Sequence, residues 1–204
     1  MKYPNTLTRD LMYSLLISYH SNLPHMYNYD KELGFILGDE TKKVVLDIGC
    51  GFGSEFIFVM KKYNIQRTII LLDANPLVFK RELPRWYNHS QLDVRKIPEI
   101  KRDFGRLSLD DFLKIGADAC DIPLKNNSID IVHQQYMFSD NECLEEDTTG
   151  ILNEIHRILK KDGIYLYSEG MEVEGLPPTK KDGFKVLKEA DHLCSFYYTV
   201  CKKL

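Results

Sequence analysis

The 204-residue sequence lacks several features that would assign it to a specialised class of protein. Its five cysteines include no C-x-x-C pair, and an odd number of scattered thiols suits neither a disulfide framework nor a zinc cluster. No apolar run approaches the roughly 20 residues that span a bilayer, and the N-terminus has no signal-peptide layout. We therefore expect a cytoplasmic protein with reduced thiols, no bound metal and no association with membranes.

The sequence also lacks a strong excess of charge of either sign. It carries 27 basic and 30 acidic residues, a formal net charge of −3. Domains that bind nucleic acid usually carry a basic excess, so the composition disfavours this function and leaves open only a local basic patch. Hydrophobic residues make up 44% of the chain, which is enough for one globular domain with a sizeable core.

Short apolar runs alternate with helical patterns along the chain. Periodicity predicts helices at 55–63, from Pro76 onward and over 151–159, the last ending at the signals Lys160, Lys161 and Gly163. Strands are expected at residues 44–46, 68–72, 128–133, 164–168, 184–187 and 196–200. This alternation predicts an α/β fold with a mostly parallel, doubly wound sheet, in which ligands bind beyond the carboxyl ends of the strands.

The first chemical motif directly follows the 44–46 strand: Asp47-Ile48-Gly49-Cys50-Gly51-Phe52-Gly53-Ser54. Glycine permits positive φ and close approach of a ligand to the backbone, and the N–H groups of the next helix then face that ligand. A dinucleotide-binding loop has the spacing G-x-G-x-x-G, whereas the third glycine comes one residue early here. Asp47 would repel a diphosphate and suit an ammonium group. The loop therefore favours a zwitterionic or cationic ligand, and an NAD-dependent oxidoreductase is disfavoured.

Residues 44–53 resemble motif I of the class I S-adenosylmethionine-dependent methyltransferases. In that family the loop wraps the methionine part of the cofactor and the acid holds its amino group. The resemblance thus implies a group of cofactor contacts: Asp47, Gly49, Cys50, Gly51 and Gly53. It covers roughly residues 42–202, and is greatest to the small-molecule (type 11) branch. It implies a seven-stranded Rossmann-like sheet at 41–204, preceded by an N-terminal helical cap at 1–40.

Two more acids are expected near the same cofactor. Asp73 ends the 68–72 strand, where it can accept both hydroxyls of a ribose or simply cap a helix. Asp118 lies in Gly116-Ala117-Asp118-Ala119-Cys120-Asp121-Ile122-Pro123-Leu124, which resembles the family passage G-D-A-x-x-L-P-F with one additional residue, Ala117. There the acid accepts from the adenine amino group and the next residue offers its N–H to the ring. The resemblance implies Asp73, Ala74, Asp118 and Ala119 as contacts, with Asp93 as a rival for the adenine acid.

The residues after the 128–133 strand should overlook the transferred methyl group. They read His133-Gln134-Gln135-Tyr136-Met137-Phe138 and lack the N/D-P-P-F/Y motif of enzymes that methylate amino groups of nucleic-acid bases. His133 and Tyr136 are candidate general bases, and His133 is also a candidate cofactor contact, although a structural histidine is the alternative. Glu154 and His156 are interpreted as solvated or capping residues.

Two regions are candidates for substrate binding. An insertion at about 84–111 contains the only tryptophan, Trp86, among basic residues, and is either a lid, a docking surface or a solvated segment. The Gly- and Pro-rich stretch after the 164–168 strand is short, so the pocket would depend on residues 1–40.

Together these features predict an S-adenosylmethionine-dependent methyltransferase that releases S-adenosylhomocysteine. The expected acceptor is a small molecule, with nucleic acid a less favoured one. The alternative is a non-catalytic, cofactor-binding subunit that scaffolds or activates a partner.

Overall fold

The structure is a computed structural model, and it describes residues 33–50, 66–74, 79, 112–135, 137, 145–170, 182–192 and 196–204. The helices expected at 55–63 and after Pro76 lie outside these residues, as does the insertion at about 84–111. Of the expected N-terminal cap, residues 33–40 are described, and 33–38 form a helical segment. The domain boundary between residues 40 and 41 stays a prediction.

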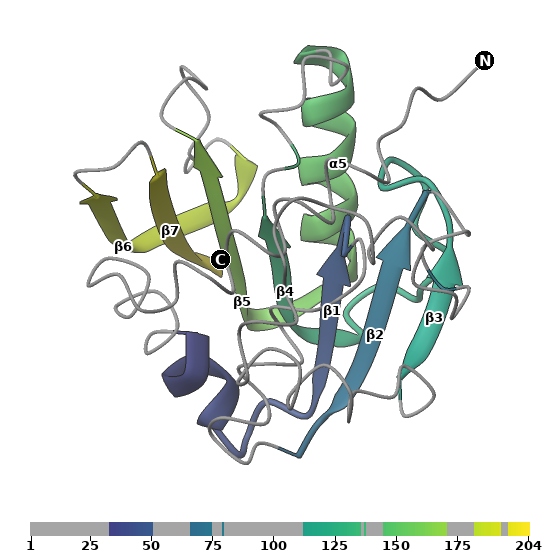
Figure 1. The fold of residues 1–204 in the computed structure, drawn as a ribbon, viewed down its shortest axis with the longest axis horizontal. Coiled ribbons are helices and arrows are strands. Elements are labelled where there is room, and N and C mark those ends of the chain that lie inside the picture. The colour runs from purple at the N-terminus through teal and green to yellow at the C-terminus, as the bar shows by residue number, and fades with distance from the viewer. Residues whose placement is uncertain are drawn as a thin grey trace, which may run out of the picture.

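The described chain is built on one seven-stranded sheet with the spatial order β3-β2-β1-β4-β5-β7-β6 (Figure 1). Neighbours among β1 to β5 pair in parallel, whereas β7 runs antiparallel to both β5 and β6. The strands are β1 Val44–Ile48, β2 Thr68–Asp73, β3 Leu113–Gly116, β4 Ile129–Gln135, β5 Leu159–Gly170, β6 Phe184–His192 and β7 Phe196–Lys203. The predicted doubly wound, mostly parallel sheet is confirmed.

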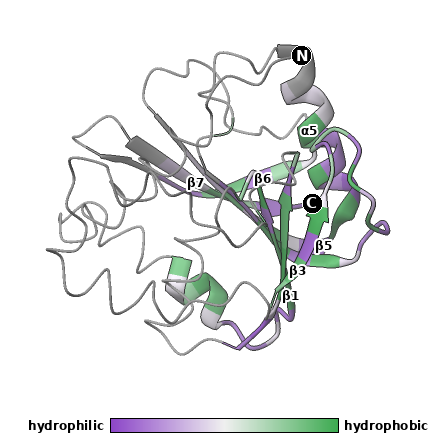
Figure 2. Ribbon diagram, turned by 45° about the vertical axis from the view of Figure 1, so that its right-hand side comes forward, coloured by the Kyte–Doolittle hydropathy of each residue, from purple (hydrophilic) through white to green (hydrophobic). Residues whose placement is uncertain are grey.

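Apolar layers cover both faces of this sheet, which explains why the central strands read as continuous apolar runs. On one face, helix α5 (Glu145–Ile158) packs Ile151, Ile155 and Ile158 against alternate residues of the strands, such as Leu46. On the other face, the helical segment 33–38 packs Leu33 and Leu37 against the remaining positions, such as Val45 and Leu71. Figure 2 shows α5 and the 33–38 segment on opposite sides of the sheet.

The junction between α5 and β5 differs from the sequence-based expectation. The predicted helix end at residue 159 agrees with the end of α5 at Ile158 to within one residue, but β5 begins at Leu159 and not at residue 164, so Lys160, Lys161 and Gly163 lie within the strand. The pairing with β4 shifts here, from Ile129 opposite Leu159 to Ile131 opposite Ile164, and the positive φ of 62° falls on Asp162. The strand start was predicted too late because the basic residues and glycine that follow a helix end also suit an irregular strand.

Asp130 ties this junction to the start of β1. Its Oδ2 accepts hydrogen bonds from the backbone N–H groups of Lys43 (3.1 Å) and Val44 (2.9 Å). Both carboxylate oxygens also accept from Lys160 Nζ, at 2.9 and 3.0 Å. Burial acts to raise the pKa of Asp130, but these donors outweigh burial and hold the pKa below its ordinary value. The anchor lies at the amino end of β1, opposite the edge where the glycine motif begins.

Candidate functional site

The candidate site lies where the chain changes direction across the sheet. From β1 the chain continues outward to β2 and β3, and it then returns to β4 on the other side of β1. The gap between the carboxyl ends of β1 and β4 is therefore the topological switch point, where open α/β sheets bind ligands.

The strand register places two of the predicted acids at this edge. Asp47 pairs with Leu71 of β2, and Asp73 follows two residues later at the end of the same strand. Because side chains alternate between faces along a strand, Asp47, Leu71 and Asp73 lie on the same face of the sheet. The two carboxylates therefore occupy one edge and one face.

The turn after β1 has the backbone geometry that the glycine motif predicts. Gly49 has a positive φ of 63°, and the N–H of Cys50 donates to the carbonyl of Leu72 at 3.1 Å. A Cβ on Gly49 would lie 3.3 Å from the Sδ atom of Met137, so a side chain there would be both strained and crowded. Gly51 and Gly53 lie outside the described residues.

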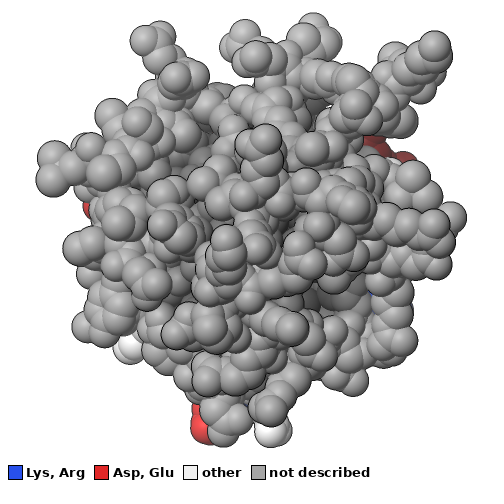
Figure 3. All heavy atoms as spheres, viewed as in Figure 1, with Lys and Arg blue, Asp and Glu red and all other residues white. Residues whose placement is uncertain are grey.

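A short hydrogen bond joins Asp47 to His133 across the switch point. The two residues are register partners in β1 and β4, and His133 Nδ1 lies 2.6 Å from Asp47 Oδ1. Their side chains are buried, with residue exposures of 2% for His133 and 4% for Asp47. By contrast, Figure 3 shows acidic side chains of other described residues at the molecular surface, along the margins of the view. The candidate histidine and the motif I acid thus form one buried pair.

The carboxylates also determine the character of the Cys50 thiol. Burial raises the pKa of Cys50 well above its ordinary value, and the negative charges of Asp47 and Asp73 raise it further. Cys50 is therefore a neutral thiol near neutral pH, and only a thiolate would be a good nucleophile. Within the turn, the backbone N–H of Cys50 donates to the carbonyl of Leu72.

The third motif follows β3 and is tied to the end of β2. The N–H of Ala117 donates to the carbonyl of Asp73 at 3.2 Å. Asp118 Oδ1 accepts from the N–H of Cys120 at 2.8 Å, which forms a compact turn that leaves Asp118 exposed and Ala119 half-buried. The additional residue of the motif, Ala117, therefore serves to attach this turn to β2.

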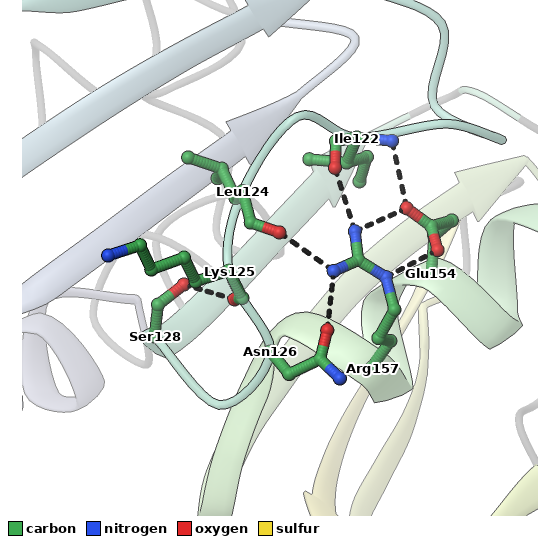
Figure 4. Close-up of polar contacts among 7 residues, drawn as sticks. All are labelled: Ile122, Leu124, Lys125, Asn126, Ser128, Glu154 and Arg157. Carbon is green, nitrogen blue, oxygen red and sulfur yellow. Dashed lines mark hydrogen bonds and ion pairs between the residues drawn. The ribbon is translucent and has the colours of Figure 1, made fainter.

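An ion pair on α5 holds the chain that follows this turn (Figure 4). Arg157 donates to the carbonyl oxygens of Ile122 and Leu124, both at 2.7 Å, and to Asn126 Oδ1 at 2.8 Å. It also binds both oxygens of Glu154, at 2.6 and 2.7 Å, while Glu154 Oε2 accepts from the N–H of Ile122 at 2.8 Å. Glu154 thus caps a loop amide, in agreement with the capping interpretation.

His156, the other polar residue on α5 that the sequence singled out, has a structural environment. Its ring packs edge-on against Phe184, with 5.5 Å between the ring centroids. Burial lowers the pKa of His156, and the positive charge of Lys203 lowers it further. His156 is therefore a packed side chain, and the expectation that it is solvated or caps a helix was wrong.

Several predicted residues are placed at this edge and others are not described. Ala74 is exposed just after β2, and Asp118 and Ala119 follow β3. Tyr136 and the rival acid Asp93 lie outside the described residues. Sequence reasoning missed the Asp47–His133 pair and the Arg157–Glu154 ion pair. The E-x-x-R spacing, which puts both side chains on one helix face, was the available signal for the latter.

The described residues contain no group of three or more His, Cys, Asp or Glu side chains arranged to hold a metal ion. No described helix has both the length and the hydrophobicity to cross a membrane.

A family model described as "Methyltransferase domain" matches residues 46–167, which is more than half of the chain. The chain therefore belongs to this family of methyltransferase domains. The sequence-based expectation of a class I, S-adenosylmethionine-dependent methyltransferase fold is confirmed. A search among curated proteins finds no match to the sequence.

Solved structures of low sequence identity share the fold. A TehB-like S-adenosylmethionine-dependent methyltransferase of Corynebacterium glutamicum is 14% identical, with a TM-score of 0.62 and coverage of 99% of this chain and 100% of that one. A Galdieria sulphuraria protein named for sarcosine and dimethylglycine methylation is 16% identical, with a TM-score of 0.59 and coverage of 87% and 86%. A Haloferax volcanii chain from a complex between the Trm112 methyltransferase activator and a methyltransferase is 14% identical, with a TM-score of 0.57 and coverage of 91% and 94%.

Proposed function

We propose that this protein transfers the methyl group of S-adenosylmethionine to a small-molecule acceptor by in-line displacement. The observation that carries the proposal is the convergence of Asp47, Asp73 and Asp118 on one edge of the sheet, beside the switch point. Family membership and the fold of the Corynebacterium methyltransferase support the choice of cofactor. The nearly balanced charge of the chain and the absence of an N/D-P-P-F/Y motif favour a metabolite over a nucleic acid.

We propose that the residues predicted for the site hold this cofactor. The buried carboxylate of Asp47 suits its ammonium group, and the turn at Gly49, Cys50, Gly51 and Gly53 would hold the methionine part by its backbone. Asp73 and Ala74 would hold the ribose, and Asp118 and Ala119 the adenine. The positive φ of Gly49 supports a turn in which a ligand can approach the backbone closely.

The cofactor supplies an electrophilic methyl group on a positively charged sulfur. The chain's own part is to align the acceptor with the bond that breaks and to exclude water, and alignment can lower a barrier by about 7–11 kcal/mol. A general base is needed only where the acceptor must lose a proton. Nδ1 of His133 is engaged with Asp47, so a role as base would fall to its other ring nitrogen, Nε2, and His133 stays a candidate base. Tyr136 stays a candidate base.

Titration calorimetry with S-adenosylmethionine and S-adenosylhomocysteine tests cofactor binding. Asp73→Ala removes the acceptor proposed for the ribose hydroxyls, and we expect it to weaken binding at least about tenfold, since hydrogen bonds to charged groups contribute about 1.5–3 kcal/mol each. Glu40→Ala, an exposed acid before the amino end of β1, is the matched control and should leave binding unchanged. Folded wild-type protein that binds neither compound contradicts the proposal.

Methyl transfer is tested with a labelled methyl group on the cofactor. Purified protein is incubated with separate small-molecule, RNA, DNA and protein fractions of a cell extract. We expect label to enter the small-molecule fraction, and label confined to a macromolecular fraction would contradict the proposed acceptor class.

The second candidate function is a cofactor-binding subunit that needs a partner for activity. Two observations favour it: the short connection between Gly170 at the end of β5 and Phe184 at the start of β6, and the Haloferax complex with an activator. Turnover by the purified chain alone would exclude this alternative.

A further inference from the structure

The Asp47–His133 pair stands in a row that is otherwise apolar. Asp47 pairs with Leu71 of β2, and His133 pairs with Leu166 of β5, so the four residues form one line across the centre of the sheet. Leu71 and Leu166 are fully buried and offer no hydrogen bond from their side chains. Within this row, His133 is therefore the side chain that can hold the carboxylate of Asp47 in one orientation by a hydrogen bond.

The short distance between His133 Nδ1 and Asp47 Oδ1 indicates which of the two atoms is the donor. A carboxylate oxygen and an unprotonated ring nitrogen are both acceptors and would repel each other at 2.6 Å, so His133 Nδ1 carries a proton and donates it to Asp47 Oδ1. Among the described residues, no donor reaches the other carboxylate oxygen, Oδ2. Oδ1 of the buried Asp47 carboxylate accepts the hydrogen bond from His133, whereas Oδ2 can accept one from a ligand. Burial of a carboxylate costs free energy unless its oxygens are paired with donors.

We infer that His133 is a positioning residue for cofactor recognition: it holds Asp47 in the orientation in which Oδ2 receives the ammonium group of the ligand. The inference rests on the function proposed above and adds a residue from β4 to the amine-binding part of the site. His133 acts through Asp47, so its contribution concerns the amino-acid portion of the ligand and leaves the adenosine portion unaffected. A histidine that serves only to pack the core would affect both portions alike.

Two ligands separate these roles. S-adenosylhomocysteine carries the ammonium group, whereas 5′-methylthioadenosine keeps the adenosine and the sulfur but lacks the amino-acid portion. The measured quantity is the ratio of their dissociation constants, obtained by calorimetry on the full chain. For His133→Leu we expect binding of S-adenosylhomocysteine to weaken about tenfold, in line with loss of one hydrogen bond to a charged group, and binding of methylthioadenosine to change less than about twofold.

The conservative variant should rescue the effect. The amide nitrogen of an asparagine can occupy the position of Nδ1, so we expect His133→Asn to bind S-adenosylhomocysteine within about threefold of the wild-type protein. Gln134→Leu is the matched control, because it removes a buried polar side chain from the next position of β4, which contacts Tyr165 on the opposite face. Neither ligand should be affected by it.

The outcomes distinguish the inference from the proposed function. Equal weakening of both ligands by His133→Leu, or no change in either, overturns the inference while the proposed function stands. Wild-type protein that binds neither ligand overturns the proposed function and the inference with it. If circular dichroism shows that His133→Leu does not fold, His133→Gln provides the same comparison, since its longer side chain places the amide near Nε2 instead of Nδ1.

Discussion

Replacement of Arg157 by methionine is the most informative test of the loop that carries the third motif. The variant keeps the apolar stem of the side chain but removes three hydrogen bonds to residues 122–126 and the ion pair with Glu154. Hydrogen bonds to a charged group contribute about 1.5–3 kcal/mol each, and the figure is smaller where water can replace the partner. Because the Arg157 side chain is 31% exposed, we expect the free energy of unfolding to fall by about 3 kcal/mol in total.

Chemical denaturation and thermal melting measure this loss. For a domain of this size, about 3 kcal/mol corresponds to a fall in Tm of about 6–12 °C. Lys161→Met, an exposed cation in the same region, is the control and should change the stability by less than about 0.5 kcal/mol. A double-mutant cycle with Glu154→Gln should give a coupling of about 1–2 kcal/mol. A loss below about 1 kcal/mol for Arg157→Met would refute the argument that this guanidinium holds the loop.

Three further predictions concern other parts of the sheet. The pKa of Asp130 is lowered in the folded state, so the ionised carboxylate stabilises the fold at pH values above its ordinary pKa of 3.8, and this stabilisation is lost as the pH falls through the folded pKa. In denaturation series at several pH values, the difference in unfolding free energy between the wild type and Asp130→Asn should therefore shrink below about pH 4. Gly183→Ala should destabilise the fold by more than about 2 kcal/mol in melting experiments, because φ is +82° and the new Cβ would lie 2.5 Å from a histidine ring on α5, whereas Gly38→Ala meets open space and should be neutral. Cys50 and Cys201 should resist alkylation at pH 8 in peptide mapping, since burial raises the pKa of both thiols, that of Cys201 to about 12; rapid labelling would contradict this.

The sequence predicts the central strands well because each is an apolar run buried on both faces. β3 was not located in the sequence, because Leu113–Gly116 is only four residues long and stands at the edge of the sheet, where Leu113 is 59% exposed and the burial pattern is weak. The start of β5 was misassigned for a different reason. The turn chemistry of Lys160 to Gly163 is shared by helix ends and strand irregularities, and only the pairing with β4 decides between them.

The acids of the candidate site could be found from the sequence because each lies at or just beyond the carboxyl end of a strand. Their proximity follows from parallel pairing, which brings the carboxyl ends of β1 and β2 to one edge. The partner of Asp47 could not be found in this way. His133 lies 86 positions further along the chain, and its contact depends on β4 being the strand next to β1 and on the register between them. A single sequence carries no information on such a register.

The position of β7 has a consequence for how the molecule forms. Residues 196–203 lie between β5 and β6, so the last strand along the chain is an interior one. During synthesis, β6 has no β7 to pair with until those residues leave the ribosome, and β5 presents an open edge until then. Nascent chains halted before residue 196 should therefore be prone to self-association and dependent on chaperones, and completion of the sheet should follow emergence of residues 196–203.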